Sequence, residues 1–437
     1  MNVALAKTDS GRAVSGIFSD ARNRLPGAGR VAEIRRQAFE AFERAGLPYR
    51  RIEDWKYTDL RALMREVAPL AAAPDARQIA RARAAVKLHA IGGASKLVLV
   101  DGVFALELSD AGLEVGVSVH SLREALERDG NGADFLVTKA QDSMISLNAA
   151  MATDGVLVSI ADGAALSRPV QIIHVATATK ASVFTRSHLK IGKGAHLTLV
   201  ESFVAAEGAK AYQAHDALIV SIGDEAEVSQ VRLMADAPDA VNISSLILTI
   251  GAKAKVNLFN MTSGAAVSRL QGFISLTGEG TELSVNGVNL LKETQHGDTT
   301  MFVDHAVPHC MSREVFRAVV DDRAHSVFQG RIVVQPDAQK TDAKMMTRAL
   351  LLSDEAEADN KPELEIFADD VTCGHGATSG ALDEGLLFYL RARGLPEKEA
   401  QALLIQAFVG EAIEGIADEN LREHVMSLAA RWLEARS

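Results

Sequence analysis

The sequence predicts a mainly β protein built around one long parallel β-helix, with helical regions at its two ends. Two observations support this fold class. From Lys96 onward the chain is a series of short β-branched runs, each ended by glycine or an acidic turn residue. Within these runs a six-residue turn pattern recurs, with a small or acidic first residue, a small fourth residue and usually an apolar sixth residue.

The turn pattern recurs at nearly regular intervals. It reads ADGAAL from Ala161, GKGAHL from Gly192, GDEAEV from Gly223, GAKAKV from Gly251 and GEGTEL from Gly278, with weaker copies DDRAHS from Asp321 and SDEAEA from Ser353. The starting positions differ by 31, 31, 28, 27, 43 and 32 residues. Such spacing is typical of stacked coils and not of scattered hairpins. We therefore expect the copies to stack on one edge of a β-helix, with an insertion or an unmarked coil in the widest interval.

The first 90 residues are predicted to form an N-terminal helical cap. Residues 31–45 place apolar side chains along one stripe at helical spacing, and Gly46-Leu47-Pro48 then ends the helix. Residues 51–60 read RIEDWKYTDL, and the Ala- and Arg-rich stretch 71–88 is typical of a helix or a linker. The β-helix core is then assigned to residues 91–382.

Residues 383–437 are predicted to form a C-terminal helical module. Two apolar patches occur at helical spacing, one made of Leu403, Leu404, Ala407 and Phe408, the other of Leu421, Val425, Leu428 and Trp432. One patch can pack on the end of the β-helix. The second patch either packs against the first or meets a partner protein.

Composition excludes several classes of function. Lys and Arg total 46 against 57 for Asp and Glu, giving a formal net charge of −11 without a basic run, so nucleic acid is not an expected partner. No apolar signal core or stretch of roughly 20 apolar residues is present, so we expect a cytoplasmic protein without a membrane partner. Cys310 and Cys373 alone are too few for a disulfide framework or a four-thiolate metal site.

The segment from 368 to 395, ADDVTCGHGATSGALDEGLLFYLRARGL, resembles the SufB/SufD family of iron–sulfur cluster assembly scaffold proteins. Its Cys-x-His-Gly-Ala-Thr and Phe-Tyr-Leu-x-x-Arg-Gly motifs carry the resemblance, which is dense from about Val303 to Leu395 and weaker in the preceding strands. Residues 51–60 resemble the amino-terminal signature of the SufD-like branch. Met346 or Thr347 stands where SufB-like members carry a functional cysteine.

The resemblance implies a right-handed parallel β-helix that pairs with SufB and binds the ATPase SufC through its C-terminal helices, with flavin-linked or cysteine-desulfurase partners nearby. The chain lacks a Gly-x-x-x-x-Gly-Lys-Ser/Thr phosphate loop, so any use of ATP would come from a partner. We therefore expect a non-catalytic scaffold subunit. It would bind no cofactor stably by itself and would share a transient iron–sulfur cluster within the complex. The alternatives are a SufB-like homodimeric cluster carrier and a polysaccharide-active β-helix enzyme.

His375 is the first candidate functional residue. It lies between Gly374 and Gly376, which leave room for its imidazole, and a neutral imidazole is a good iron ligand. The pattern alone favours a hydrogen-bonded structural histidine, whereas the resemblance implies a cluster-assembly ligand at the interface with SufB. Cys373 shares a strand face with His375, and either assists it or is a small buried apolar side chain. The resemblance further implies that Leu403, Leu404 and Phe408 contact SufC.

Two other groups of residues are weaker candidates. His296, His305, His309 and Cys310 form a second concentration of metal-ligating types, but the flanking residues argue against a helix, so we interpret them as hydrogen-bonded side chains. The pairs Asp321-Asp322 and Asp369-Asp370 could serve a polysaccharide-cleaving enzyme. We interpret them as solvated corners, because aromatic residues make up only 5% of the chain and offer few platforms for sugar stacking.

Overall fold

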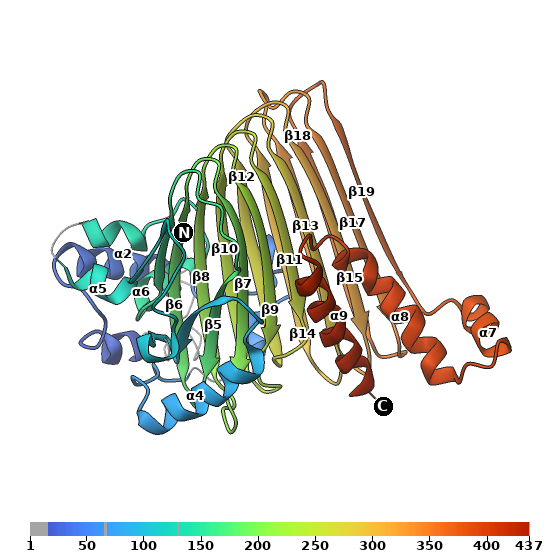
Figure 1. The fold of residues 1–437 in the computed structure, drawn as a ribbon, viewed down its shortest axis with the longest axis horizontal. Helices are drawn as coiled ribbons and strands as arrows, with labels where there is room; N and C mark the ends of the chain where they lie inside the picture. Colours follow the sequence, from blue (N-terminus) through green and yellow to red (C-terminus); the bar gives the residue numbers. More distant parts are fainter. Residues whose placement is uncertain (1–15, 65–67, 129–130, 437) are drawn as a thin grey trace, which may run out of the picture.

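The computed structural model describes residues 16–64, 68–128 and 131–436. Two sheets dominate these residues, and the chain passes alternately from one to the other (Figure 1). From β4 onward every pairing along the two stacks is parallel, which produces a parallel β-solenoid of about eight turns. The predicted mainly β fold with helices at both ends is thereby confirmed.

The ten-stranded sheet contains β2 (Val103–Phe104), β1 (Ser95–Val100), β5 (Val170–Ala176), β7 (His196–Ala205), β9 (Glu227–Ala235), β11 (Lys255–Thr262), β13 (Glu282–Leu291), β15 (Met311–Val320), β17 (Asp342–Leu351) and β19 (Thr372–Gly380), in that spatial order. The nine-stranded sheet contains β3 (Val117–Ser121), β4 (Val156–Ile160), β6 (Ser182–Ile191), β8 (Gln213–Ile222), β10 (Val241–Ile250), β12 (Val267–Leu276), β14 (His296–His305), β16 (His325–Val334) and β18 (Glu357–Ile366).

Helices flank the solenoid near both ends. They are α2 (Arg30–Ala45), α3 (Leu60–Leu63), α4 (Ala76–His89), α5 (Leu122–Glu127), α6 (Ser143–Met151), α7 (Glu384–Ala392), α8 (Glu397–Ile413) and α9 (Glu419–Glu434), with short 3-10 turns at Glu53–Trp55, Leu106–Leu108 and Asn131–Leu136. The helix predicted for residues 31–45 is α2. The stretch 71–88 is largely α4, whose N-terminus is fixed by a capping box between Asp75 and Gln78. The proposed boundaries near residues 90 and 382 remain a prediction.

The turns that lead from the nine-stranded to the ten-stranded sheet stack on one edge. Backbone N–H groups donate from each turn to a carbonyl oxygen of the next: Gly163 to Lys193 (2.8 Å), Gly194 to Asp224 (2.8 Å), Glu225 to Ala252 (2.7 Å), Lys253 to Glu279 (2.9 Å) and His309 to Gln339 (2.9 Å). All five strong copies of the turn pattern, from Ala161 to Gly278, lie on this edge. The predicted stacking is confirmed for these copies.

The prediction of a single edge is wrong for the two weaker copies. Asp321 follows β15 and Ser353 follows β17, so both lie on the opposite edge, where the chain returns to the nine-stranded sheet. The widest interval contains an unmarked turn of the first edge, at residues 306–310. A left-handed φ of 60° at His309 identifies this turn, because each of the five marked turns also contains one left-handed residue. His309 adopts this conformation without being glycine.

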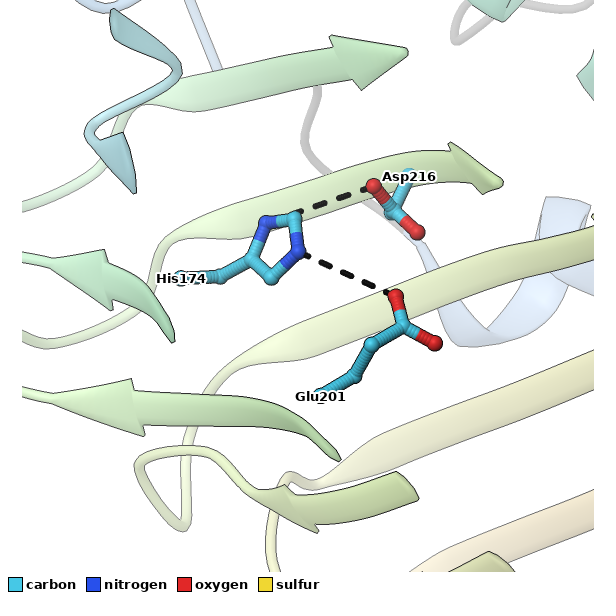
Figure 2. Close-up of side chains that lie close together, drawn as sticks. All are labelled: His174, Glu201 and Asp216. Carbon is cyan, nitrogen blue, oxygen red and sulfur yellow. Dashed lines mark ion pairs between the residues drawn. The ribbon is translucent and has the colours of Figure 1, made fainter. Parts of the chain in front are cut away.

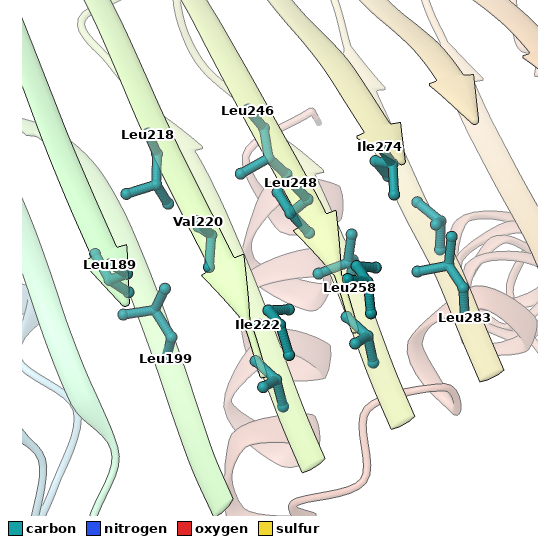
Figure 3. Packing of buried hydrophobic residues seen from close by; sticks show 14 of the residues in the cluster. Leu189, Leu199, Leu218, Val220, Ile222, Leu246, Leu248, Leu258, Ile274 and Leu283 are labelled. Carbon is teal, nitrogen blue, oxygen red and sulfur yellow. The ribbon is translucent and has the colours of Figure 1, made fainter. Parts of the chain in front are cut away.

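The main hydrophobic core fills the space between the two sheets. Val220, Leu248 and Ile274 occupy paired positions on β8, β10 and β12, and all three are buried. Figure 3 shows how such side chains from successive strands lie in rows. Each turn of the solenoid therefore buries its inward residues against the turns on either side.

Helices cover the outer face of the ten-stranded sheet in two places. α4 packs on β1 and β5 near the N-terminal end, while α8 and α9 pack on β9 to β17 (Figure 1). The second apolar patch predicted on the C-terminal helices lies in this contact, because Leu421, Val425 and Trp432 are buried beside Ile405 and Val409 of α8. The sequence pattern could not decide whether this patch packs on the other helix or meets a partner protein. In the structure it packs on the other helix.

A segment near the N-terminus lies along the outer face of the nine-stranded sheet. Trp55 is buried, stacks under the Arg269 guanidinium at 3.8 Å from the ring centroid, and donates to Asp142 at 2.9 Å. Its neighbours Glu53 and Asp54 form ion pairs with Lys361 of β18 and Arg331 of β16. Residues 53–59, here called the strap, thereby connect strands β12 to β18.

Candidate functional site

The last strand of the ten-stranded sheet carries the two residues singled out from the sequence. Cys373 is paired with Ala343 of β17, and His375 is paired with Met345. Ala343 and Met345 are buried between the sheets, so Cys373 and His375 continue an inward-facing row. Among the described residues no strand pairs with the other side of β19. The row therefore ends at an open rung, and His375 is exposed there.

Cys373 and His375 differ in their surroundings. Cys373 is half-buried against the main core, and burial raises the pKa of its thiol above the ordinary value. The thiol is thus mostly protonated at neutral pH in the isolated chain. The two flanking glycines also differ, because a Cβ at Gly374 would meet nothing within 4 Å, whereas a Cβ at Gly376 would lie 2.6 Å from Cε of Met346. Both glycines lie on the strand face opposite to His375, where Gly376 makes room for Met346 and the space beside Gly374 is open.

The C-terminal helices present an exposed apolar surface. α7 has no buried residue, and Leu386, Phe388 and Tyr389 are 53%, 74% and 54% exposed. Leu403 of α8 is 46% exposed. We call these four residues the α7–α8 surface.

A groove borders the α7–α8 surface. It has a volume of ≈ 470 Å³ and is lined by Leu386, Leu404 and Phe408, together with Leu382 and residues at the end of β19. Phe408 also packs on the core beneath α8. Of the three residues predicted to contact a partner, Leu403 is therefore on the surface, while Leu404 and Phe408 line the groove.

The second concentration of histidine and cysteine is dispersed in the structure. Thr58 of the strap lies 2.9 Å from His296 Nε2, His305 Nε2 lies 3.0 Å from Ser312 Oγ, and Cys310 is buried with its thiol 3.4 Å from the Gly278 oxygen. For His296, His305 and Cys310 these contacts agree with the interpretation as hydrogen-bonded side chains.

The two aspartate pairs lie on opposite edges of the solenoid. Asp321 and Asp322 follow β15, and Asp369 and Asp370 follow β18. Asp321 is 2.5 Å from Arg436, and Asp370 is paired with Lys340. Because the two pairs lie in turns on opposite edges, they agree with the interpretation as corners. They do not bring two carboxylates to either side of one glycosidic bond.

A buried cluster that the sequence analysis missed lies inside the solenoid near its N-terminal end. It joins His174 of β5, Glu201 of β7 and Asp216 of β8 (Figure 2). Nε2 of His174 is 4.0 Å from Oε1 of Glu201, and Nδ1 is 4.0 Å from Oδ1 of Asp216. One signal was present in the sequence: Glu201 continues the alternation of Leu197 and Leu199, so it falls on an inward position.

Burial controls the protonation of this cluster. It lowers the pKa of His174 to about 4, more than Asp216 raises it, so the imidazole is neutral at physiological pH. Burial also raises the pKa of Glu201, assisted by the adjacent Asp216 and opposed by Arg232. Among the described residues, this is the one group of three or more histidine, cysteine or acidic side chains close enough to hold a metal ion.

No described helix has both the length and the apolar character needed to cross a membrane. Comparison with protein families gives two matches that together span most of the chain. Residues 18–172 match the SufBD protein N-terminal region, and residues 174–408 match the SufBD core domain of SUF system FeS cluster assembly.

Individual relatives agree with the family matches. The iron–sulfur cluster assembly protein SufD of Escherichia coli is 30% identical over 398 residues, covering 90% of each chain. A SufBD family iron–sulfur cluster assembly protein of Synechocystis is 30% identical over 85% of this chain and 84% of its own. SufD of Bacillus subtilis is 26% identical over 67% of each chain. The chain, with its parallel β-solenoid and its terminal Cys-x-His rung, therefore belongs to the SufB/SufD family of iron–sulfur cluster assembly proteins and is similar to SufD over most of its length.

Proposed function

We propose that this chain is the scaffold subunit of a cytoplasmic SufB–SufC–SufD complex, in which it pairs with SufB through the open rung and docks the SufC ATPase through its C-terminal helices. In this proposal the chain catalyses no reaction by itself. It supplies a surface and one or two side chains to a cluster that is built at the interface.

The observation that carries the proposal is a difference between the two last strands. β18 contains Pro362 and the charged residues Glu357, Asp359, Lys361, Glu363 and Glu365, whereas β19 reads TCGHGATSG and contains no charge and no proline. Charges and proline are the features that protect an edge strand from pairing. β19 lacks both, so it is the edge suited to a partner strand.

The hydrogen-bonding direction of the two strands supports the same conclusion. Glu357 N–H donates to Ala324 in the preceding turn, so the even-numbered residues of β18, including Pro362, face the open side. Thr372 N–H donates to Thr341, so the odd-numbered residues of β19 face the open side. The open side of β18 thus lacks one N–H donor, at Pro362. The open side of β19 has an N–H donor at every outward position.

The open rung also suits a shared cluster. Iron–sulfur clusters are generally held by four protein ligands, and this rung offers His375 and, at most, the thiol of Cys373. The remaining ligands would have to come from SufB. We therefore propose that the cluster is transient and interfacial, and that the lone chain holds no stable cluster.

The proposed SufC contact rests on the α7–α8 surface and its groove. Leu386, Phe388, Tyr389 and Leu403 are all at least 46% exposed, and contiguous exposed apolar side chains usually mark an interaction site. Because α8 is anchored on the ten-stranded sheet, a partner that moves during ATP hydrolysis would transmit force directly to the solenoid.

Pairing can be tested by changing one residue on the open side of β19. Ala377→Pro removes an outward N–H group without removing a bond to β17, whereas Ala377→Val keeps that N–H group and is the matched control. Co-expressed with SufB and SufC, the proline variant is expected to fold but not to co-purify with SufB, and the valine variant to co-purify. Wild-type recovery of SufB with the folded proline variant would refute pairing through β19.

The lone chain, purified without SufB and SufC, distinguishes the homodimeric alternative. A homodimeric cluster carrier would sediment as a dimer without SufB and would retain iron and sulfide after reconstitution. The proposal expects the lone chain to lose both on desalting.

A further inference from the structure

The buried cluster inside the solenoid has two sides. On one side, the Arg232 guanidinium contacts Oε2 of Glu201 at 2.7 Å and Oδ2 of Asp216 at 3.1 Å. On the other side, Oε1 of Glu201 and Oδ1 of Asp216 face the imidazole of His174. Each carboxylate is therefore oriented by the guanidinium through one oxygen and directs its second oxygen toward the histidine (Figure 2).

Further contacts hold these groups in place. Gln230 donates to Oε2 of Glu201 at 2.7 Å, and Thr185 donates to Oδ1 of Asp216 at 2.7 Å. The His174 ring stacks on Phe203 with a centroid distance of 4.3 Å and an interplanar angle of 8°. Such supporting contacts are what orient metal ligands in known sites.

The cluster is incomplete as it stands. Nε2 of His174 has no hydrogen-bond partner, and because the side chain is only 10% exposed, solvent does not supply one. Such an unpaired buried nitrogen is costly. In addition, Glu201 and Asp216 share one guanidinium, so Arg232 can balance only one of the two carboxylates when both are ionised.

There is also space beside the cluster. A cavity of ≈ 30 Å³ is lined by His174 and Asp216, with Tyr212 and Asp236 on its wall. A volume of about 10–15 Å³ measured in this way holds one water, so a water ligand fits beside His174 and Asp216, while Glu201 lies outside the cavity lining. One ligand atom from each of His174, Glu201 and Asp216 lies within 4.8 Å of the other two.

We propose that His174, Glu201 and Asp216 bind one divalent first-row transition-metal ion inside the solenoid, with Arg232 orienting both carboxylates from behind. One imidazole and two carboxylates suit Mn²⁺, Fe²⁺ or Zn²⁺, and the nitrogen ligand disfavours Mg²⁺ and Ca²⁺. The ion would coordinate the unpaired Nε2 of His174 and balance the second carboxylate of the pair Glu201 and Asp216. Ligand atoms about 2.0–2.2 Å from the ion lie closer together than 4.0 Å, so binding requires the side chains to draw in slightly.

This site is separate from the open rung and does not depend on the proposed function. It would revise the expectation that the chain alone binds no cofactor, since a single ion is held without any partner subunit. The ion would tie together β5, β7 and β8, which belong to both sheets, and so stabilise the first turns of the solenoid.

The test uses the full chain carrying Cys373→Ser and His375→Ala, so that the open rung cannot compete for metal. After treatment with a chelator, the protein is titrated with Co²⁺, followed by visible absorption, and with Mn²⁺, followed by electron paramagnetic resonance. We expect one ion per chain. Glu201→Gln, which keeps the size of the side chain, and His174→Asn should each weaken binding at least tenfold.

The matched control is His188→Asn, which changes a buried histidine of β6 that contacts Phe135 and no acidic group. This variant should still bind one ion. Circular dichroism and thermal unfolding verify that each variant is folded, and anomalous scattering from a Mn²⁺-soaked crystal locates the ion. The proposal is overturned if the folded parent binds no stoichiometric ion, or if Glu201→Gln and His174→Asn bind as tightly as His188→Asn.

Discussion

Glu314 and His375 occupy the same inward-facing row of the ten-stranded sheet, and Met345 is the single residue between them. Glu314 is 1% exposed, and neither of its carboxylate oxygens has a hydrogen-bond partner. Burial raises its pKa to about 8. At neutral pH the side chain is therefore a neutral carboxylic acid inside the core, two strands below the exposed imidazole.

Stability should depend on pH through Glu314. In the unfolded chain its pKa has the ordinary value of 4.5, so between about pH 4.5 and about pH 8 the folded state holds a proton that the unfolded state releases. The free energy of unfolding should consequently fall as pH rises through this window, by roughly 3–5 kcal/mol in total. Glu314→Gln should remove this part of the pH dependence. Urea unfolding at several pH values measures it.

The control for Glu314 is Glu282→Gln, which changes an exposed glutamate at the start of β13. It should unfold with the pH dependence of the wild type. Equal pH slopes for Glu314→Gln and wild type would mean that Glu314 is hydrated or paired in solution.

His375→Ala should leave the fold and the complex intact but sharply lower cluster formation, because the exposed imidazole contributes no packing. The yield is measured by absorption and by iron and sulfide content of the reconstituted complex. His120→Ala is the matched control, since His120 is an exposed strand histidine at the opposite end of the solenoid. If the His375 variant complex assembles clusters in wild-type yield, the imidazole is not a ligand.

Gly278→Ala should destabilise the solenoid by about 1–3 kcal/mol or more. A Cβ at this position would lie 1.9 Å from the Ala252 nitrogen and 2.3 Å from its Cα, both in the backbone of the adjacent turn. Gly380→Ala, which meets nothing within 4 Å, is the control and should change stability little. Denaturant unfolding compares the two, and equal midpoints would show that the stacked turns yield to a methyl group.

Trp55→Ala should cost about 3–5 kcal/mol of stability, the range for removing a large buried aromatic side chain. The loss includes the stacking on Arg269 and the hydrogen bond to Asp142. Tyr57→Ala, two residues away and only partly buried, should cost much less. A small effect of Trp55→Ala would indicate that the strap is dispensable for the solenoid.

Phe388→Ser should weaken SufC binding at least tenfold while leaving pairing with SufB unchanged. Phe388 is 74% exposed, so its loss removes apolar surface without disturbing the core. Leu106→Ser removes an apolar side chain of similar exposure, 68%, at the other end of the chain, and should bind SufC normally. Equal binding of both variants in a pull-down would place the SufC contact elsewhere.

Local patterns in the sequence were sufficient to predict the solenoid, since small residues recur where turns stack closely. They predicted an insertion or an unmarked coil in the widest interval but did not locate the turn containing His309, because Val307 stands where the other copies have a small or acidic first residue. The resemblance of one motif singled out Cys373 and His375 as candidates, and their role in cluster assembly stays a prediction. The local patterns did not identify His174 with Asp216, because those residues meet only through the winding of the chain between two sheets. Predicting such a pair requires knowing which strands become neighbours.

The strap has a consequence for the order in which the chain can be completed. Glu53 is paired with Lys361, 308 residues later in the sequence, and contacts of such separation form late because the intervening chain must first be closed into a loop. During synthesis the residues made early must therefore wait for β18 before they can dock. A truncated chain that ends before β18 cannot make this contact, so docking of the strap on Lys361 requires synthesis to have passed β18.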